Sequence, residues 1–244
     1  MRTLAIAAVL IVVAGSAPAA EIDALVTTAM KSALDELVPA FERASGHGPS
    51  GGVARRFVGG EPADMVMIDS GALDELIRQG KVVPGRTDVA RTGIGIAVRK
   101  GAPRPDVSTP EALRSALLAA RSIGHTAPAG GGITAAHIMR VFETLGIAAE
   151  VTPKVKLAAG GPNGRVSVLV SSGEVEIGLQ QVSELMSNPE VEVIGLLPAQ
   201  LQQITTYSAG IAANAREPGA GNALIDFLTT PAAMAVYKAR GLGL

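Results

Sequence analysis

One apolar stretch constrains the fold of this chain more than any other feature. Residues 93–98, Gly-Ile-Gly-Ile-Ala-Val, have the pattern of a short buried strand, and Gly-Ala-Pro at 101–103 ends it with a turn. A similar stretch, Ala-Gly-Ile-Ala-Ala, occupies residues 209–213. Strand and helix signals alternate before the first stretch and again between the two. We therefore predict two lobes joined by two crossings of the chain, with a ligand cleft between them.

The alternation of strands and helices predicts an α/β fold, because such units build sheets that are covered by helices on both faces. Most of the expected helices follow an apolar strand pattern, and they begin near Ser, Thr, Asp or Gly. The expected strands cover residues 22–26, 63–68, 122–126, 154–157, 176–180 and 191–196. The expected helices cover residues 30–44, 53–59, 72–79, 110–119, 133–145, 165–172, 220–228 and 232–239.

We expect two Rossmann-like lobes, each with a central mixed sheet, joined by a two-strand hinge. The hinge strands would lie near residues 93–98 and 207–213. Lobe 1 would then contain residues 20–92 and 210–244, and lobe 2 would contain residues 93–209.

The amino terminus has the pattern of an export signal. Arg2 precedes an apolar run at 4–13 that is too short to span a bilayer, and Ala17-Pro18-Ala19 fits a cleavage site. We expect residues 1–19 to be a signal peptide and the mature protein to be periplasmic; a retained anchor is the alternative. The chain has no Cys, which excludes thiol chemistry and suits a periplasmic protein held by its core alone.

The charge and the aromatic content of the chain argue against several classes of ligand and partner. The net charge is −1 without basic or acidic blocks, so neither nucleic acid nor an anionic membrane is favoured as a partner. The chain has no Trp, two Tyr and four Phe, which argues against sites that stack on sugars or bases. His47, His125 and His137 lack metal-ligand spacing. We expect neither a metal nor a cofactor.

Several loops between a strand and a helix share Ser, Thr or Gly. Free backbone N–H groups and the helix dipole make such loops anion receptors, and ligands of parallel sheets bind at the carboxyl ends of strands. Ordinary helix capping is the alternative for any single loop, but their joint placement favours an anion site. The candidate ligand-binding residues are Thr27, Thr28, Ser50, Gly51, Asp69, Ser70, Thr126, Gly132, Thr134, Gly161, Gln180 and Gln181.

Five segments carry a resemblance to a known family. They are residues 29–37, 60–66, 93–98, 173–178 and 227–233. With them the chain resembles the type 2 periplasmic solute-binding proteins of ABC transporters, in particular the molybdate-binding-like group. The resemblance implies lobes that close on a small anion and deliver it to a membrane permease, and we expect a monomer.

The chain departs from that group in three places. Residues 45–49, Ser-Gly-His-Gly-Pro, contain no apolar run where the family has a strand, so we expect this strand to be missing. Gln180-Gln181-Val182-Ser183 replaces a loop that contributes a Tyr in molybdate binders. Ala127 and Gly130 stand where relatives often have Asp and Ser. A small organic acid is therefore at least as well supported as molybdate.

An enzyme is the alternative function. Aconitate isomerase, which acts on a tricarboxylic acid, also resembles the molybdate-binding-like group. Moving a double bond requires a base and an acid near the substrate. The candidates are His125, Glu184 and Tyr207, and the cations available for carboxylates are Arg55, Arg56 and Arg165. His125 has a plainer reading as a hydrogen-bonded residue at a strand end. We expect a binding protein without catalytic residues.

Overall fold

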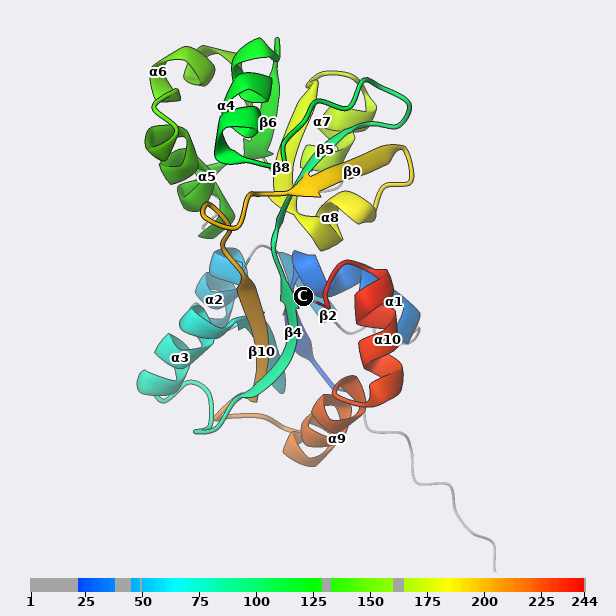
Figure 1. The fold of residues 1–244 in the computed structure, drawn as a ribbon. Coiled ribbons are helices and arrows are strands. Elements are labelled where there is room, and N and C mark those ends of the chain that lie inside the picture. Colours follow the sequence, from blue (N-terminus) through cyan, green and yellow to red (C-terminus); the bar gives the residue numbers. More distant parts are fainter. Residues whose placement is uncertain (1–21, 38–44, 49, 129–132, 160–164, 244) are drawn as a thin grey trace, which may run out of the picture.

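The computed structural model describes residues 22–37, 45–48, 50–128, 133–159 and 165–243. They form two α/β lobes, each built around a five-stranded mixed sheet (Figure 1). The predicted fold class is confirmed. Residues 1–21, which include the expected signal peptide, lie outside the described part, as do residues 38–44 with Pro39. None of the described helices combines the length and apolarity needed to cross a bilayer.

The sheet of the first lobe has the order β2-β1-β3-β10-β4. Its strands β1, β2 and β3 are parallel, and β10 runs antiparallel to β3 and β4. The strands are β1 (Ala24–Thr27), β2 (Ser45–Gly48), β3 (Met65–Asp69), β4 (Thr87–Thr92) and β10 (Thr205–Ile211).

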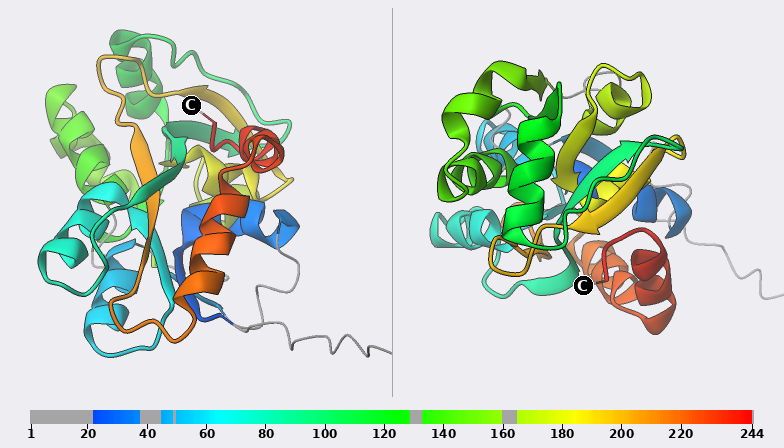
Figure 2. Two further views of the ribbon diagram at one scale, coloured as in Figure 1. Left: turned by 90° about the horizontal axis from the view of Figure 1, so that it is seen from below. Right: turned by 45° about the horizontal axis from the view of Figure 1, so that its top comes forward.

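Helices cover both faces of this sheet. Strand β3 explains the arrangement, because its side chains alternate between two apolar clusters, with Met65 and Met67 in one and Val66 and Ile68 in the other. Figure 2, left, shows the red α10 on one side and the cyan helices on the other. The helices are η1 (Thr28–Met30), α1 (Lys31–Leu37), α2 (Ser50–Val58), α3 (Ser70–Arg78), α9 (Pro218–Leu228) and α10 (Pro231–Ala239).

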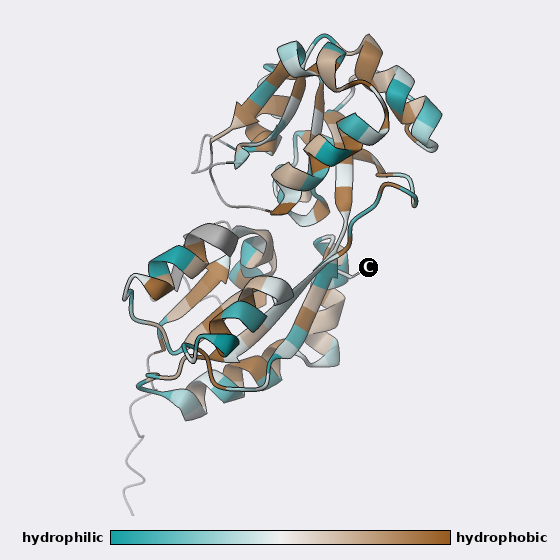
Figure 3. Ribbon diagram, turned by 90° about the vertical axis from the view of Figure 1, so that its left-hand side faces the viewer, coloured by the Kyte–Doolittle hydropathy of each residue, from teal (hydrophilic) through white to brown (hydrophobic). Residues whose placement is uncertain are grey.

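The second lobe repeats this plan with the sheet order β7-β6-β8-β5-β9. Its strands are β5 (Ile94–Arg99), β6 (Ile123–Thr126), β7 (Val155–Ala158), β8 (Ile177–Gln181) and β9 (Val191–Leu196). Figure 3 shows that apolar residues follow the strands of both lobes. The helices are α4 (Pro110–Ala119), α5 (Ile133–Thr144), α6 (Ala148–Val151), η4 (Thr152–Lys154), α7 (Val166–Ser171) and α8 (Val182–Met186).

The expected helix starts are confirmed at three positions. Thr109 Oγ1 accepts a hydrogen bond from Ala112 N at the start of α4. Asp69 and Thr230 accept equivalent bonds at the starts of α3 and α10. In α4 and α10 a Pro follows the capping residue, where its missing N–H costs no intrahelical bond.

The prediction that the strand at 45–48 is missing is wrong. Strand β2 pairs in parallel with β1 over the register Ala24↔Ser45 to Thr27↔Gly48. It lies at the edge of the first sheet. An edge strand is held by backbone hydrogen bonds to a single neighbour, so the sequence Ser-Gly-His-Gly can form one without an apolar side chain.

The chain passes between the lobes at two places, of which the first lies within the expected hinge segment 93–98 and the second lies before the expected segment 207–213. Gly93 alone separates β4 in the first sheet from β5 in the second. The return lies at 197–204, between β9 and β10. All of β10 belongs to the first sheet, so the expected boundary at 209/210 falls inside this strand. We propose Gly93 and residues 197–204 as the hinge segments.

Candidate ligand site between the lobes

One pocket takes its lining from both lobes and has a cavity volume of about 180 Å³. Helix α8 of the second lobe packs against η1 of the first at this place. The size suits a small acid or an oxyanion rather than a drug-sized ligand. The lining residues are Thr28, Lys31, Ser32 and Asp35 from the first lobe and Arg165, Ser183, Glu184 and Ser187 from the second.

The first lobe contributes one polar face of a short helical segment. Thr28, Lys31 and Asp35 are spaced by three and four residues, which places them on the same side of a helix. Ala33 and Leu34 lie on the buried side and belong to the first-lobe core. Lys31 Nζ is 2.7 Å from Asp35 Oδ2. The lysine charge at this wall is therefore partly compensated within the helix.

The second lobe contributes a buried hydroxyl and a titratable carboxyl. Ser183 is buried, and its Oγ has no hydrogen-bond partner among the described residues. Burial raises the pKa of the Glu184 carboxyl to about 7, although the nearby Arg165 guanidinium acts in the opposite direction. Both protonation states of Glu184 are therefore accessible at neutral pH.

Glu184 also acts across the boundary between the lobes. Tyr207 of β10 lies opposite Asp69 of β3 in the first sheet. Burial, together with the negative charges of Glu184 and Asp69, raises the pKa of Tyr207 well above its ordinary value. Tyr207 therefore keeps its proton at neutral pH. Titratable groups of the two lobes are electrostatically coupled here.

The structure brings the predicted loops of the first lobe to one edge of the sheet. Thr27–Thr28, Ser50–Gly51 and Asp69–Ser70 follow the carboxyl ends of the parallel strands β1, β2 and β3. Thr28 lines the interlobe pocket. The Asp69 carboxylate accepts a hydrogen bond from Ala72 N at 3.0 Å, so it caps α3.

The predicted polar residues of the second lobe also gather together, but they bond to one another. Gln181 Nε2 donates to Thr134 Oγ1 and to Thr205 Oγ1, each at 3.0 Å. Gln180 Nε2 donates to Thr126 Oγ1. Because Thr205 belongs to β10, Gln181 connects the second lobe to the first sheet. Among the described residues, Gln181 Oε1 has no partner.

Two predicted residues, Gly132 and Gly161, lie outside the described part of the chain. Sequence reasoning missed five residues of the pocket as ligand candidates: Lys31, Ser32, Asp35, Ser183 and Ser187. The spacing of the polar side chains that follow Thr28 was the available signal for the first three.

His125 packs in the second lobe and does not line the interlobe pocket. Its Nδ1 is 2.9 Å from the carbonyl oxygen of Thr126, and its ring meets Phe142 edge-on at a centroid distance of 6.0 Å. Burial lowers the pKa of His125, and the bond to Thr126 raises it in part. This geometry agrees with a neutral, structural histidine at a strand end.

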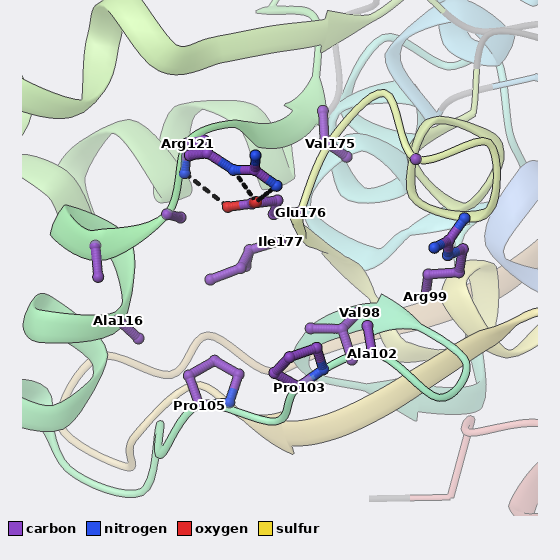
Figure 4. A pocket seen from close by; sticks show the side chains of 13 residues that line it. Val98, Arg99, Ala102, Pro103, Pro105, Ala116, Arg121, Val175, Glu176 and Ile177 are labelled. Carbon is purple, nitrogen blue, oxygen red and sulfur yellow. Dashed lines mark hydrogen bonds and ion pairs between the residues drawn. The ribbon is translucent and has the colours of Figure 1, made fainter.

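A larger cavity of about 420 Å³ lies wholly within the second lobe (Figure 4). Two of its charged groups compensate each other, because Arg121 forms an ion pair with Glu176 and also donates its backbone N–H to that carboxylate. It lies beside the first residues of β8, at the opposite end of that strand from Gln181. It has none of the contributions from both lobes that a closing cleft requires.

The comparisons with known proteins identify the family. Residues 22–243 match the model of the bacterial extracellular solute-binding proteins. The chain belongs to this family. It is 30% identical to an aconitate isomerase from a Pseudomonas species, over 99% of this chain and 96% of that protein. It is 25% identical to the molybdate-binding protein ModA of Azotobacter vinelandii, over 94% of this chain and 92% of that protein.

Solved structures agree on the fold. The periplasmic molybdate-binding protein of Azotobacter vinelandii superposes with a TM-score of 0.73 at 19% identity, covering 92% of this chain and 99% of that one. The sulfate-binding protein SubI from Mycobacterium tuberculosis gives a TM-score of 0.67 at 17% identity, covering 91% and 85%. The predicted resemblance to molybdate-binding-like, type 2 periplasmic solute-binding proteins is confirmed.

Proposed function

We propose that this protein is exported to the periplasm, captures a small anion between its lobes, and delivers it to the permease of an ABC transporter. The supporting observation is a pocket to which each lobe contributes a cation and hydroxyl groups. Lys31 with Thr28 stands on one wall, and Arg165 with Ser183 on the other. A ligand that contacts both walls would favour the closed arrangement, because it binds that state better than the open one.

We infer that the ligand is a small organic acid rather than molybdate. The Gln180–Ser183 segment differs from the molybdate-binder loop. The greater identity to an aconitate isomerase than to ModA also favours an organic acid.

Isothermal titration of the mature chain, residues 20–244, tests this proposal. The probes are aconitate, citrate, sulfate and molybdate. Arg165 is half-buried, and losing such a charge partner from a bound anion weakens a complex, so Arg165→Ala should weaken binding by at least about tenfold. Arg104→Ala is the matched control, because Arg104 pairs with Glu192 at the exposed surface of β9. Absence of binding by every probe would refute anion capture.

A second candidate function is isomerisation of the bound acid. It is favoured by the 30% identity to an aconitate isomerase and by Glu184, a carboxyl with a pKa of about 7 coupled to the protonated Tyr207. Groups with a pKa near the working pH are the most effective proton carriers. One carbon of the substrate would lose a proton and another would gain one as the double bond moves, so no oxidant is needed.

Proton NMR of aconitate in D₂O separates the two functions. An isomerase would interconvert the aconitate isomers and introduce deuterium at carbon, and Glu184→Gln would abolish both effects. His125→Phe should leave them unchanged. Tight binding without exchange at carbon would reject the enzyme and leave the binding protein.

A further inference from the structure

Glu184 is an unexpected side chain in a pocket that receives anions. Among the described lining residues, two are basic, Lys31 and Arg165, and two are acidic, Asp35 and Glu184. With both acids ionised the four charges cancel, and with Glu184 protonated the pocket carries one positive charge. The protonation state of Glu184 therefore decides whether the pocket attracts an anion.

Arg165 is the cation of this pocket that Glu184 affects most directly. Lys31 and Asp35 form an ion pair on α1 at 2.7 Å, so their charges largely offset each other. Among the described residues, Arg165 has no ion-pair partner within contact distance, and its charge acts on Glu184. An ionised Glu184 would compete with an incoming anion for Arg165. A protonated Glu184 would leave the guanidinium available and add a hydrogen-bond donor.

The neighbouring hydroxyl points to a ligand at the same place. Ser183 precedes Glu184 on α8, and its Oγ is buried without a partner in the described part of the chain. Buried hydroxyls are normally hydrogen-bonded. An oxygen-rich ligand in this pocket would satisfy Ser183 and Glu184 together.

We propose that Glu184 holds the captured anion as a neutral acid and donates its proton in a hydrogen bond to it, so that capture takes up a proton from solution. This inference rests on the proposed anion capture. It specifies the ligand as an oxyanion or carboxylate that accepts hydrogen bonds from Glu184 and Ser183.

The titratable groups around Glu184 support this direction. They are Lys31 and Asp35 on α1, Arg165 at the start of α7, Tyr207 on β10 and Asp69 on β3. Tyr207 stays neutral, because burial and the charges of Glu184 and Asp69 raise its pKa. An anion in contact with Glu184 adds negative charge and raises the carboxyl pKa further above its free value of about 7.

The ligand affinity should fall as the pH rises, because the complex holds a proton on Glu184 that the free protein loses. Above pH 7 the free protein has an ionised Glu184, and the complex has a protonated one. Affinity should therefore fall by about tenfold for each pH unit above the free pKa, until the pKa of the complex is reached. Below the free pKa, Glu184 should cause no further change.

Titration calorimetry at about pH 8 in two buffers of different ionisation enthalpy counts the protons taken up on binding. The probes are sulfate, which does not titrate in this range, and aconitate. The wild type should take up close to one proton per ligand. Glu184→Gln, which imitates the neutral acid, should take up none and bind more tightly than the wild type at this pH. Glu190→Gln, at an exposed site, should keep the wild-type count.

The outcomes are distinct. Binding without proton uptake by the wild type would overturn the role of Glu184 and leave anion capture intact. Failure of every probe to bind would overturn anion capture and this inference with it. If Glu184→Gln does not fold, as circular dichroism would show, the proton count and the pH profile of the wild type decide alone.

Discussion

Replacing Asp64 should destabilise the first lobe, because its carboxylate connects three separate segments of the chain. Its Oδ2 accepts a hydrogen bond from Asp23 N at 2.8 Å. Its Oδ1 accepts from Arg216 N at 2.6 Å and from Glu217 N at 3.1 Å. Asp64 is 1% exposed, so water cannot readily replace the carboxylate at its donors.

The size of the effect follows from these bonds. Hydrogen bonds to charged groups contribute about 1.5–3 kcal/mol each, and removing one partner of a buried charged network costs about 3–5 kcal/mol. We expect Asp64→Ala to lower the free energy of unfolding by about 4 kcal/mol. For a protein of this length that corresponds to a fall in Tm of about 10 °C.

Urea unfolding followed by circular dichroism measures this change. Asp226→Ala is the control, because Asp226 is exposed on α9 and its loss should change stability by at most about 0.5 kcal/mol. A loss below about 1 kcal/mol for Asp64→Ala would refute the proposed connection between the three segments.

The same carboxylate predicts a pH dependence. Burial on its own would raise the pKa of Asp64, but the three N–H donors and the charge of Arg216 lower it below its ordinary value. A depressed pKa gives stability that is fully present above the unfolded pKa of about 4 and is lost as the pH falls through the folded pKa. The wild type should therefore lose more stability below pH 4 than Asp64→Asn does.

Two further variants test packing and the assignment of His125. An added Cβ at Gly178 would lie 2.5 Å from Val170 Cγ2, so Gly178→Ala should cost about 1–3 kcal/mol in urea unfolding. Gly219→Ala, where nothing lies within 4 Å, should cost under about 0.5 kcal/mol, and equal losses would contradict the packing of α7 on β8. His125→Phe should leave ligand affinity unchanged in calorimetry, and a loss of binding would place His125 in the site.

The fold could be predicted wherever side chains determine the structure. The capping threonines before Pro110 and Pro231 mark helix starts, and the apolar strands 65–69 and 94–99 are inner strands of the two sheets. Strand β2 could not be predicted, because the sequence Ser-Gly-His-Gly contains no apolar residue, and its pairing with β1 is a backbone pairing. Strand β4, Thr-Asp-Val-Ala-Arg-Thr, was also missed, since an edge strand keeps several polar side chains exposed.

The site was predictable in its position and less so in its residues. Loop chemistry at the carboxyl ends of strands identified Thr28, and the search for an acid or base identified Glu184. Sequence reasoning could not identify Ser187, because its place in the pocket depends on how α8 meets the first lobe. Gln181 resembled a ligand residue, but in the described structure it bonds to Thr134 and Thr205.

Hydrogen–deuterium exchange with and without saturating aconitate or sulfate tests most directly whether a ligand is held between the lobes. We expect η1 with α1 in the first lobe and α8 in the second to become protected at the same ligand concentration. Protection confined to one lobe, or centred on the cavity beside Arg121, would contradict it.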